Sequence, residues 1–250
     1  MPNENVKTND KGSQLKKLDR METLRNILPL IGLIAVFVLF TALTKGRMAQ
    51  PSNLLLLLSQ VYLTMIASMG VFFIMTMGGL DFSQGSILGM SSIVVCYLSS
   101  INIVLAIVGG IVTGALIGAF NGFFTVNRKI RSFIVTICSM FLFRGIIKYL
   151  TSQSPIAGSP SLMNFNTEAF KLTITIIIMA IGFFFFRFTK FGIYLKAIGA
   201  GEKAAKFAGI RTDRMKFLIY VLAGAITGFA AFINCVKVGS VTANGGNQLE

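Results

Sequence analysis

The residues best suited to chemistry form one polar stretch, Gly78-Gly79-Leu80-Asp81-Phe82-Ser83-Gln84-Gly85-Ser86, which lies between two long apolar runs. Asp81 is the only acidic residue between Glu22 and Glu168. Inserting a carboxylate at the centre of a bilayer costs about 2.5–3.5 kcal/mol of free energy. The glycines of this stretch let the backbone bend and approach a neighbour closely. Two interpretations remain open: a turn with a solvated Asp81, or a polar site inside a membrane bundle.

Other kinds of chemistry are poorly supported by the residues. The chain has no His, no paired carboxylates and no G-x-x-x-x-G-K-[ST] phosphate loop, so we expect no enzyme activity, metal or cofactor in the chain itself. Its three cysteines, Cys96, Cys138 and Cys235, each lie in an apolar run without metal-ligand spacing. We therefore expect them to be small packing residues.

The composition indicates a membrane protein. Of 250 residues, 54% are hydrophobic and 13% charged, and the mean hydropathy is +0.75. Several apolar runs approach the length of about 20 residues that spans a bilayer. The net charge of +14 lies in loops beside these runs, which favours anionic lipid over nucleic acid as its partner. The expected fold class is an all-α, polytopic transmembrane helical bundle.

The order of apolar and polar segments predicts about seven spans. Residues 1–26 form a basic cytoplasmic tail, and residues 27–250 form the transmembrane domain. The expected spans are residues 27–43, 54–77, 87–98, 103–126, 133–150, 172–186 and 217–236. The retained first span, without an A-x-A cleavage site after it, argues against a signal peptide.

The basic residues predict the orientation. With the N-terminus inside, the inner segments hold 17 Lys and Arg and the outer segments hold three. This asymmetry predicts a cytoplasmic N-terminus, and it places Asp81 near the inner end of two spans.

Two further features would position or line a pathway. Span 103–126 carries Gly110, Gly114, Gly118 and Gly122 at intervals of four, which places them on one face where another helix can pack closely. A ligand could instead lie against this groove and bond Asn121. Neutral solutes need hydrogen-bonding groups, so the candidates for lining a pathway include Ser91, Ser92, Thr113 and Asn121.

Segment 189–216 is too long for a turn and too polar for a span. Glu202 suits the start of a short amphipathic helix, Ala204, Ala205, Phe207 and Ala208 its apolar face, and Gly209 its end. The segment is either a connector lying on anionic lipid or a docking helix for a soluble partner.

Three blocks of residues resemble the permeases of ribose-type ATP-binding-cassette importers. The first is Gly78-Gly79-Leu80-Asp81-Phe82-Ser83. The second is Asn121-Gly122 followed by Ser132-Phe133-Ile134-Val135-Thr136 and Arg144-Gly145. The third is Thr189-Lys190-Phe191-Gly192, Ala197-Ile198-Gly199, Ala204-Ala205 and Gly209-Ile210. The blocks follow the family's order over about residues 50–235, although Ser132 stands where the family often has Pro.

The resemblance implies the bacterial inner-membrane subunit of an importer for a monosaccharide or related small polar solute. It implies a cytoplasmic ATPase that binds the ATP, an extracytoplasmic solute-binding protein, and a second permease copy of the same or a related chain. The expected pathway or gate residues are Gly78, Gly79, Asp81, Ser83, Asn121 and Arg144. The expected ATPase-coupling residues are Gly199, Glu202, Ala204, Ala205 and Gly209.

Alternatives remain beside this interpretation. Family members generally continue with further spans, so residues 245–250 are expected to lead into another block; a nontransporting remnant or scaffold would fit a chain without those spans. A secondary carrier would need acidic or His relays in its spans, and Asp81 is the one candidate. Asp81 could pair with Arg144 or cap the helix that begins near Ser83.

Overall fold

The computed structural model describes residues 27–152, 154–242, 246 and 249; the predicted tail 1–26 therefore lies outside the described residues. The chain divides into two units, residues 1–58 and 59–250, which we describe separately. The first contains the helix Ile27–Leu43, the 3-10 helix η1 (Arg47–Ala49) and the beginning of α2.

The expected all-α bundle is confirmed, since a helix covers each of the seven predicted spans. Besides Ile27–Leu43, the helices are α2 (Pro51–Thr76), α3 (Gln84–Ser99), α4 (Ile103–Val126), α5 (Ser132–Leu150), α6 (Glu168–Phe188), α7 (Lys190–Ala200), α8 (Glu202–Phe207) and α9 (Thr212–Val238). A 3-10 helix, η2 (Pro160–Phe165), and two short strands, β1 (Ile156–Ala157) and β2 (Ser240–Val241), complete the described elements. Five helices (α2, α4, α5, α6 and α9) are long and apolar enough to cross a membrane, whereas Ile27–Leu43 and α3 are shorter.

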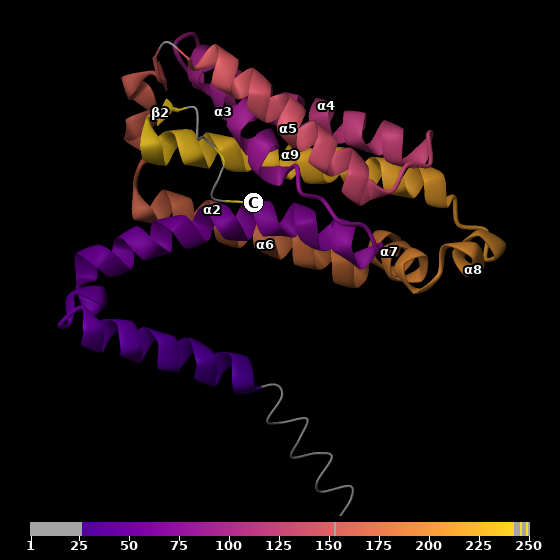
Figure 1. Cartoon of the computed structure of the whole chain (residues 1–250), viewed down its shortest axis with the longest axis horizontal. Coiled ribbons are helices and arrows are strands. Elements are labelled where there is room, and N and C mark those ends of the chain that lie inside the picture. The colour runs from indigo at the N-terminus through magenta and orange to yellow at the C-terminus, as the bar shows by residue number, and fades with distance from the viewer. Residues whose placement is uncertain (1–26, 153, 243–245, 247–248, 250) are drawn as a thin grey trace, which may run out of the picture. The chain divides into compact units, whose positions relative to one another are not determined.

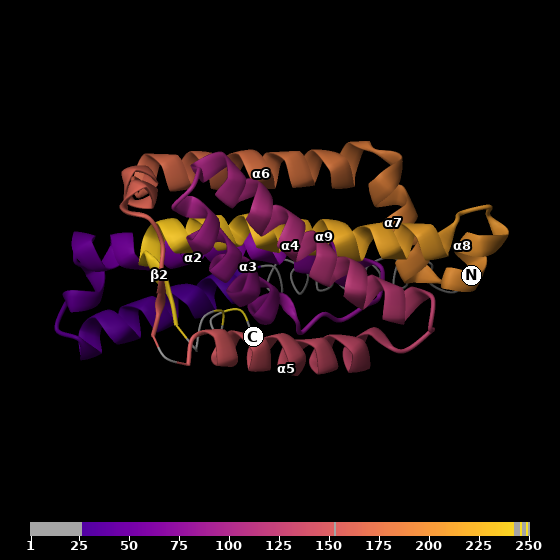
Figure 2. The same ribbon diagram turned by 90° about the horizontal axis from the view of Figure 1, so that it is seen from above.

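Helix α9 is the centre of the second unit. Two thirds of its most apolar window (67%) is buried, whereas the other long helices bury 17–39% of theirs. It packs most extensively on α4, and α3 packs on both (Figure 1). Figure 2 shows α6 on one side of α9 and α5 on the other. The apolar side chains exposed on these outer helices suit contact with lipid.

The α4 glycines form the contact with α9, as the helix-packing interpretation predicts. A Cβ atom built on Gly114 would lie 2.1 Å from the Gly224 carbonyl oxygen, and one on Gly118 would lie 2.2 Å from the Tyr220 carbonyl oxygen. Gly228 approaches Gly110 equally closely. Because these are backbone atoms, side chains cannot move aside to make room, and glycine is required along this contact.

The bundle has two distinguishable ends. At one, β1 pairs antiparallel with β2, so the α5–α6 connection is joined to the chain after α9; we call this the sheet end. At the other lie α7, α8 and the start of α9, which we call the α8 end (Figure 1). Apolar clusters fill both halves, around Leu88, Ile147 and Phe232 toward the sheet end and around Phe73 and Leu195 toward the α8 end.

The cysteines provide a test of the α3–α9 contact. Cys96 and Cys235 are buried and reduced, and their sulfur atoms lie 3.6 Å apart. We expect mild oxidation of the purified protein with a copper–phenanthroline reagent to join them in one intramolecular disulfide, measured by peptide mass before and after reduction. Cys235→Ala should abolish the crosslink, while Cys138→Ala should leave it intact. A Cys96 thiol that stays free would contradict the observed packing.

Cys138 departs from the packing role predicted for it. Cys138 is exposed on α5, so its side chain does not fill a gap within this chain. An apolar run alone does not reveal which face of a helix lies outward, because lipid-facing and core-facing residues of a membrane helix are similarly apolar.

Candidate functional site

Helix α2 ends in a glycine turn at the α8 end. Gly78 has a φ of +84°, and the amides of Gly78 and Gly79 donate to the carbonyls of Met75 and Ile74. These two bonds form a Schellman motif, which stops the helix and turns the chain. A Cβ on Gly79 would lie 3.1 Å from Ile74 and 3.3 Å from the Tyr220 hydroxyl, so the second glycine permits close packing on α9.

After Gly79 the chain is extended and runs back into the bundle before α3 begins (Figure 1). The amide of Leu80 donates to Ser132 Oγ at 3.1 Å, and the amide of Phe82 donates to Thr136 Oγ1 at 3.3 Å, one turn further along α5. Side-chain hydroxyls thus replace the hydrogen bonds that a helix would supply, as irregular backbone within a membrane bundle requires. Ser132, where the family often has Pro, takes part directly.

The Asp81 carboxylate organises the start of α3. Its Oδ1 accepts from the Ser83 amide at 2.8 Å and from Ser83 Oγ at 2.5 Å, and its Oδ2 accepts from Gln84 Nε2 at 2.6 Å. Within the part of the chain described by the structure, these donors account for all its hydrogen bonds, so pairing with Arg144 is not what holds Asp81. Asp81 instead forms an Asx turn with the Ser83 amide just before α3, whose N-cap residue is Ser83 and makes no side-chain cap bond.

The same side chains reach two more helices. Asn121 Nδ2 of α4 donates to Ser83 Oγ at 2.8 Å, and Thr227 Oγ1 of α9 donates to Gln84 Oε1. We call Asp81, Ser83, Gln84, Asn121 and Thr227 the polar network. All but Asp81 are at most 2% exposed, so the network is a buried junction of three helices.

The network lies deeper in the bundle than the sequence indicated. Thr227 stands 15 residues beyond Thr212, or roughly 22 Å along α9 at 1.5 Å per residue. Topology from basic residues places segment 78–85 in an inner loop, but this segment contains no Lys or Arg and therefore carries no charge signal. In the structure, the non-helical segment between α2 and α3 runs into the bundle instead of lying in a loop at its end. Transporters use such helix breaks near their midplane.

The remaining pathway candidates differ in burial and in whether their side chains have hydrogen-bond partners. Ser91 and Ser92 are fully buried in α3, and their hydroxyls find no hydrogen-bond partner among the described residues. Thr113 is satisfied by the Gly109 carbonyl at 2.7 Å. Arg144 lies half-buried on α5, outside the polar network. Thr227 was missed, and Gln84, although it lies in the stretch Gly78–Ser86, was not named as a pathway residue.

The expected amphipathic helix forms as α8, and α7 precedes it. Glu202 is its first residue, and Gly209, with a φ of +82°, ends it in a second Schellman motif. Ala205 is buried, whereas Ala204 and Ala208 are exposed and Phe207 is 93% exposed. The predicted apolar face is therefore mostly exposed, because α8 contacts the bundle through Ala205 while the rest of that face points outward.

Two of the coupling candidates, Gly199 and Glu202, hold this segment on the bundle, whereas Ala204 and Gly209 are exposed. A Cβ on Gly199 would lie 2.1 Å from the Thr76 carbonyl oxygen, so α7 touches the end of α2 through that glycine. Glu202 accepts from Lys216 of α9 at 2.5 Å and pairs with Lys206 at 3.3 Å, and Lys206 also pairs with Asp213. The hydrogen bond from Lys216 holds the pKa of the Glu202 carboxyl below its ordinary value of 4.5.

This lowered pKa predicts a pH-dependent attachment of α8. The Glu202 carboxylate contributes its stabilisation above the ordinary pKa, and that contribution is lost as pH falls through the lower folded pKa. We expect amide hydrogen exchange in residues 202–210, corrected for intrinsic rates, to accelerate below about pH 4.5. Glu202→Gln should exchange faster at neutral pH and lose this dependence; a pH response retained in Glu202→Gln would assign it to another group.

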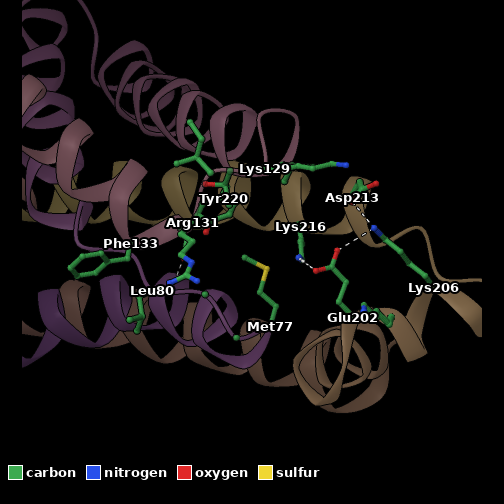
Figure 3. Close-up of a pocket in the computed structure, with 17 residues that line it drawn as sticks. Met77, Leu80, Lys129, Arg131, Phe133, Glu202, Lys206, Asp213, Lys216 and Tyr220 are labelled. Atoms are coloured by element: carbon green, nitrogen blue, oxygen red, sulfur yellow. Dashed lines mark hydrogen bonds and ion pairs between the residues drawn. The ribbon is translucent and has the colours of Figure 1, made fainter.

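A cavity of about 680 Å³ joins the two regions predicted from the sequence (Figure 3). Gly78, Gly79 and Leu80 line it from the α2–α3 bend, and Glu202 lines it from α8. The α4–α5 loop and Tyr220 of α9 complete its walls. α8 and the α2–α3 bend therefore line one cavity, whereas Asp81, Ser83, Asn121 and Arg144 do not line it.

Comparison with known proteins identifies relatives over most of the chain. The family model described as "Branched-chain amino acid transport system / permease component" matches residues 53–250. The ribose import permease protein RbsC of Bacillus subtilis is 30% identical over 98% of this chain and 79% of its own length. RbsC of Escherichia coli K12 is 25% identical (88% and 72%), and the fructose import permease protein FrcC of Rhizobium meliloti is 25% identical (87% and 65%). No solved structure matches significantly.

Proposed function

The chain belongs to the family of branched-chain amino acid transport system permease components, and from this we propose that it is the membrane subunit of an importer for a monosaccharide. The relatives named above carry ribose or fructose in their names, which favours a sugar over an amino acid as solute. In this proposal two permease copies form the pathway, a solute-binding protein delivers the sugar outside, and a cytoplasmic ATPase hydrolyses ATP. The N-terminus and the α8 end then face the cytoplasm, as the basic residues favour.

One structural observation carries the coupling part of the proposal. α8 is fixed to the bundle by Ala205 and by the Glu202–Lys216 pair, while Phe207 is almost wholly exposed at its end. An exposed aromatic residue on an anchored helix is suited to a pocket of a soluble partner. The ATPase would move α7 and α8, and the cavity walls would transmit that movement to the α2–α3 bend.

Reconstitution tests the function. The chain should be placed in proteoliposomes with its ATPase and binding protein, and uptake measured for ribose, fructose, arabinose, allose and leucine. We expect ATP-dependent uptake of one sugar. Uptake of leucine alone would reassign the solute, uptake driven by an ion gradient without ATP would indicate a secondary carrier, and no uptake of any solute would favour a nontransporting scaffold.

A variant of Phe207 tests the docking role separately. Phe207→Ala should lower solute-stimulated ATP hydrolysis about tenfold, because an interface anchor is lost. It should leave the midpoint of thermal unfolding unchanged, since this side chain contributes little to packing. Phe141→Ala, on an exposed position of α5, is the matched control and should leave stimulation intact. Equal activities of the two variants would place the docking surface elsewhere.

A further inference from the structure

The cavity beside α8 is lined by more basic than acidic residues, so ion pairs within it leave some of the positive charges unpaired. Five basic and two acidic residues line it. Glu202 and Asp213 are engaged by Lys206 and Lys216. Among the described residues, no ion pair includes the remaining three cations: Lys129, Arg131 and Lys203. The wall therefore presents three unbalanced positive charges around one space.

The geometry concentrates this charge on two elements. Lys129 and Arg131 lie in the loop between α4 and α5, and Lys203 lies on α8. Lys129 has a φ of +55°, a conformation that non-glycine residues rarely adopt and that recurs at binding sites. Arg131 extends into the cavity toward Leu80 and Met77 (Figure 3). Tyr220, whose buried hydroxyl makes no hydrogen bond of good geometry to the described residues, also lines this space.

Apolar side chains line the same cavity. Leu80, Ile130 and Phe133 line it and are 38–48% exposed. Phe133 belongs to α5, and Phe141 and Leu142 further along the same helix are also exposed and apolar. Cationic and apolar side chains in one cavity match a molecule with an anionic head and hydrocarbon chains.

We propose that this cavity binds an anionic phospholipid, with the lipid phosphate among Lys129, Arg131 and Lys203 and the acyl chains along Leu80, Ile130 and Phe133. The bound phosphate would neutralise cations on the α4–α5 loop and on α8 together, and thereby join the two elements. Only a membrane location is required for this inference, and it is independent of the solute.

Native mass spectrometry of the delipidated full chain, titrated with phosphatidylglycerol or phosphatidylcholine in detergent, tests the proposal. We expect one tightly bound phosphatidylglycerol and a preference over phosphatidylcholine. The triple variant K129Q/R131Q/K203Q should lose at least about tenfold in affinity for phosphatidylglycerol. The control R187Q/K190Q/R214Q makes the same change of charge at exposed positions outside the cavity and should bind normally.

Three results would overturn the proposal. Equal weakening by the two triple variants would assign the lipid preference to overall charge. Undiminished binding by K129Q/R131Q/K203Q with normal gel-filtration behaviour would place the lipid elsewhere. A site for soluble anions would be indicated if millimolar inorganic phosphate displaced the lipid. In that case phosphate alone should also protect residues 127–131 from hydrogen exchange as well as phosphatidylglycerol does. If K129Q/R131Q/K203Q misfolds, phosphatidylglycerol-dependent protection of residues 127–131 in the unmodified protein decides the question.

Discussion

Gly114→Leu is expected to abolish assembly of the bundle. The first atom of the new side chain would lie 2.1 Å from the Gly224 carbonyl oxygen and 2.9 Å from Gly228, and both contacts are with backbone. To accommodate it, α4 and α9 would have to separate along the most extensive helix contact of the structure. Overpacking costs about 1–3 kcal/mol even where neighbours can adjust, so a rigid backbone contact should cost more.

Fluorescence-detected gel filtration of detergent extracts measures this result. We expect less than about a tenth of the normal monodisperse peak for Gly114→Leu, because a loss of that size corresponds to 1.4 kcal/mol or more. Gly114→Ala should show a smaller loss in the same direction. Gly145→Leu on α5 is the matched control, since a Cβ there meets nothing within 4 Å. A normal peak for Gly114→Leu would mean that α4 and α9 are not packed as observed.

This contact shows how far the sequence predicts the fold. The four-residue spacing predicts which face of α4 approaches a neighbour, and Gly224 and Gly228 are spaced in the same way. The spacing does not identify the partner, because a small-residue face can accept any helix with a complementary ridge. Only the structure shows that the two glycine faces meet.

The candidate site was predicted less completely than the fold. The stretch around Asp81 was identified as special, and the start and end of α8 were placed correctly at Glu202 and near Gly209. The depth of Asp81 was not, because hydropathy and basic residues report where the chain leaves the membrane and not where an uncharged segment turns back. The outward position of Phe207 depends on how α8 docks, which is a tertiary property.

Asp81→Ala is expected to disrupt the bundle at the start of α3. The change removes the acceptor for the Ser83 amide and hydroxyl and for Gln84 Nε2, and both residues are at most 2% exposed. A buried donor left unsatisfied costs about 1–3 kcal/mol. We expect a lower midpoint of thermal unfolding and loss of uptake. Asp81→Asn should be intermediate, because its amide keeps one acceptor oxygen but turns a donor toward a donor.

A double-mutant cycle tests whether Asp81 acts through the polar network or only in the local turn before α3. The Gln84 side chain accepts a hydrogen bond from the Thr227 hydroxyl and donates one to Asp81. Asp81 and Thr227 are therefore linked through this one side chain. Asp81→Ala and Thr227→Ala should therefore destabilise less together than the sum of their separate effects, by about 0.5 kcal/mol or more in thermal or denaturant unfolding. Asp213→Ala with Thr227→Ala is the control cycle, since Asp213 is an exposed carboxylate on the same helix, and these effects should add. Additive effects in the first cycle would confine the role of Asp81 to the turn before α3, and the contact between α3 and α9 would then owe its stability to apolar packing.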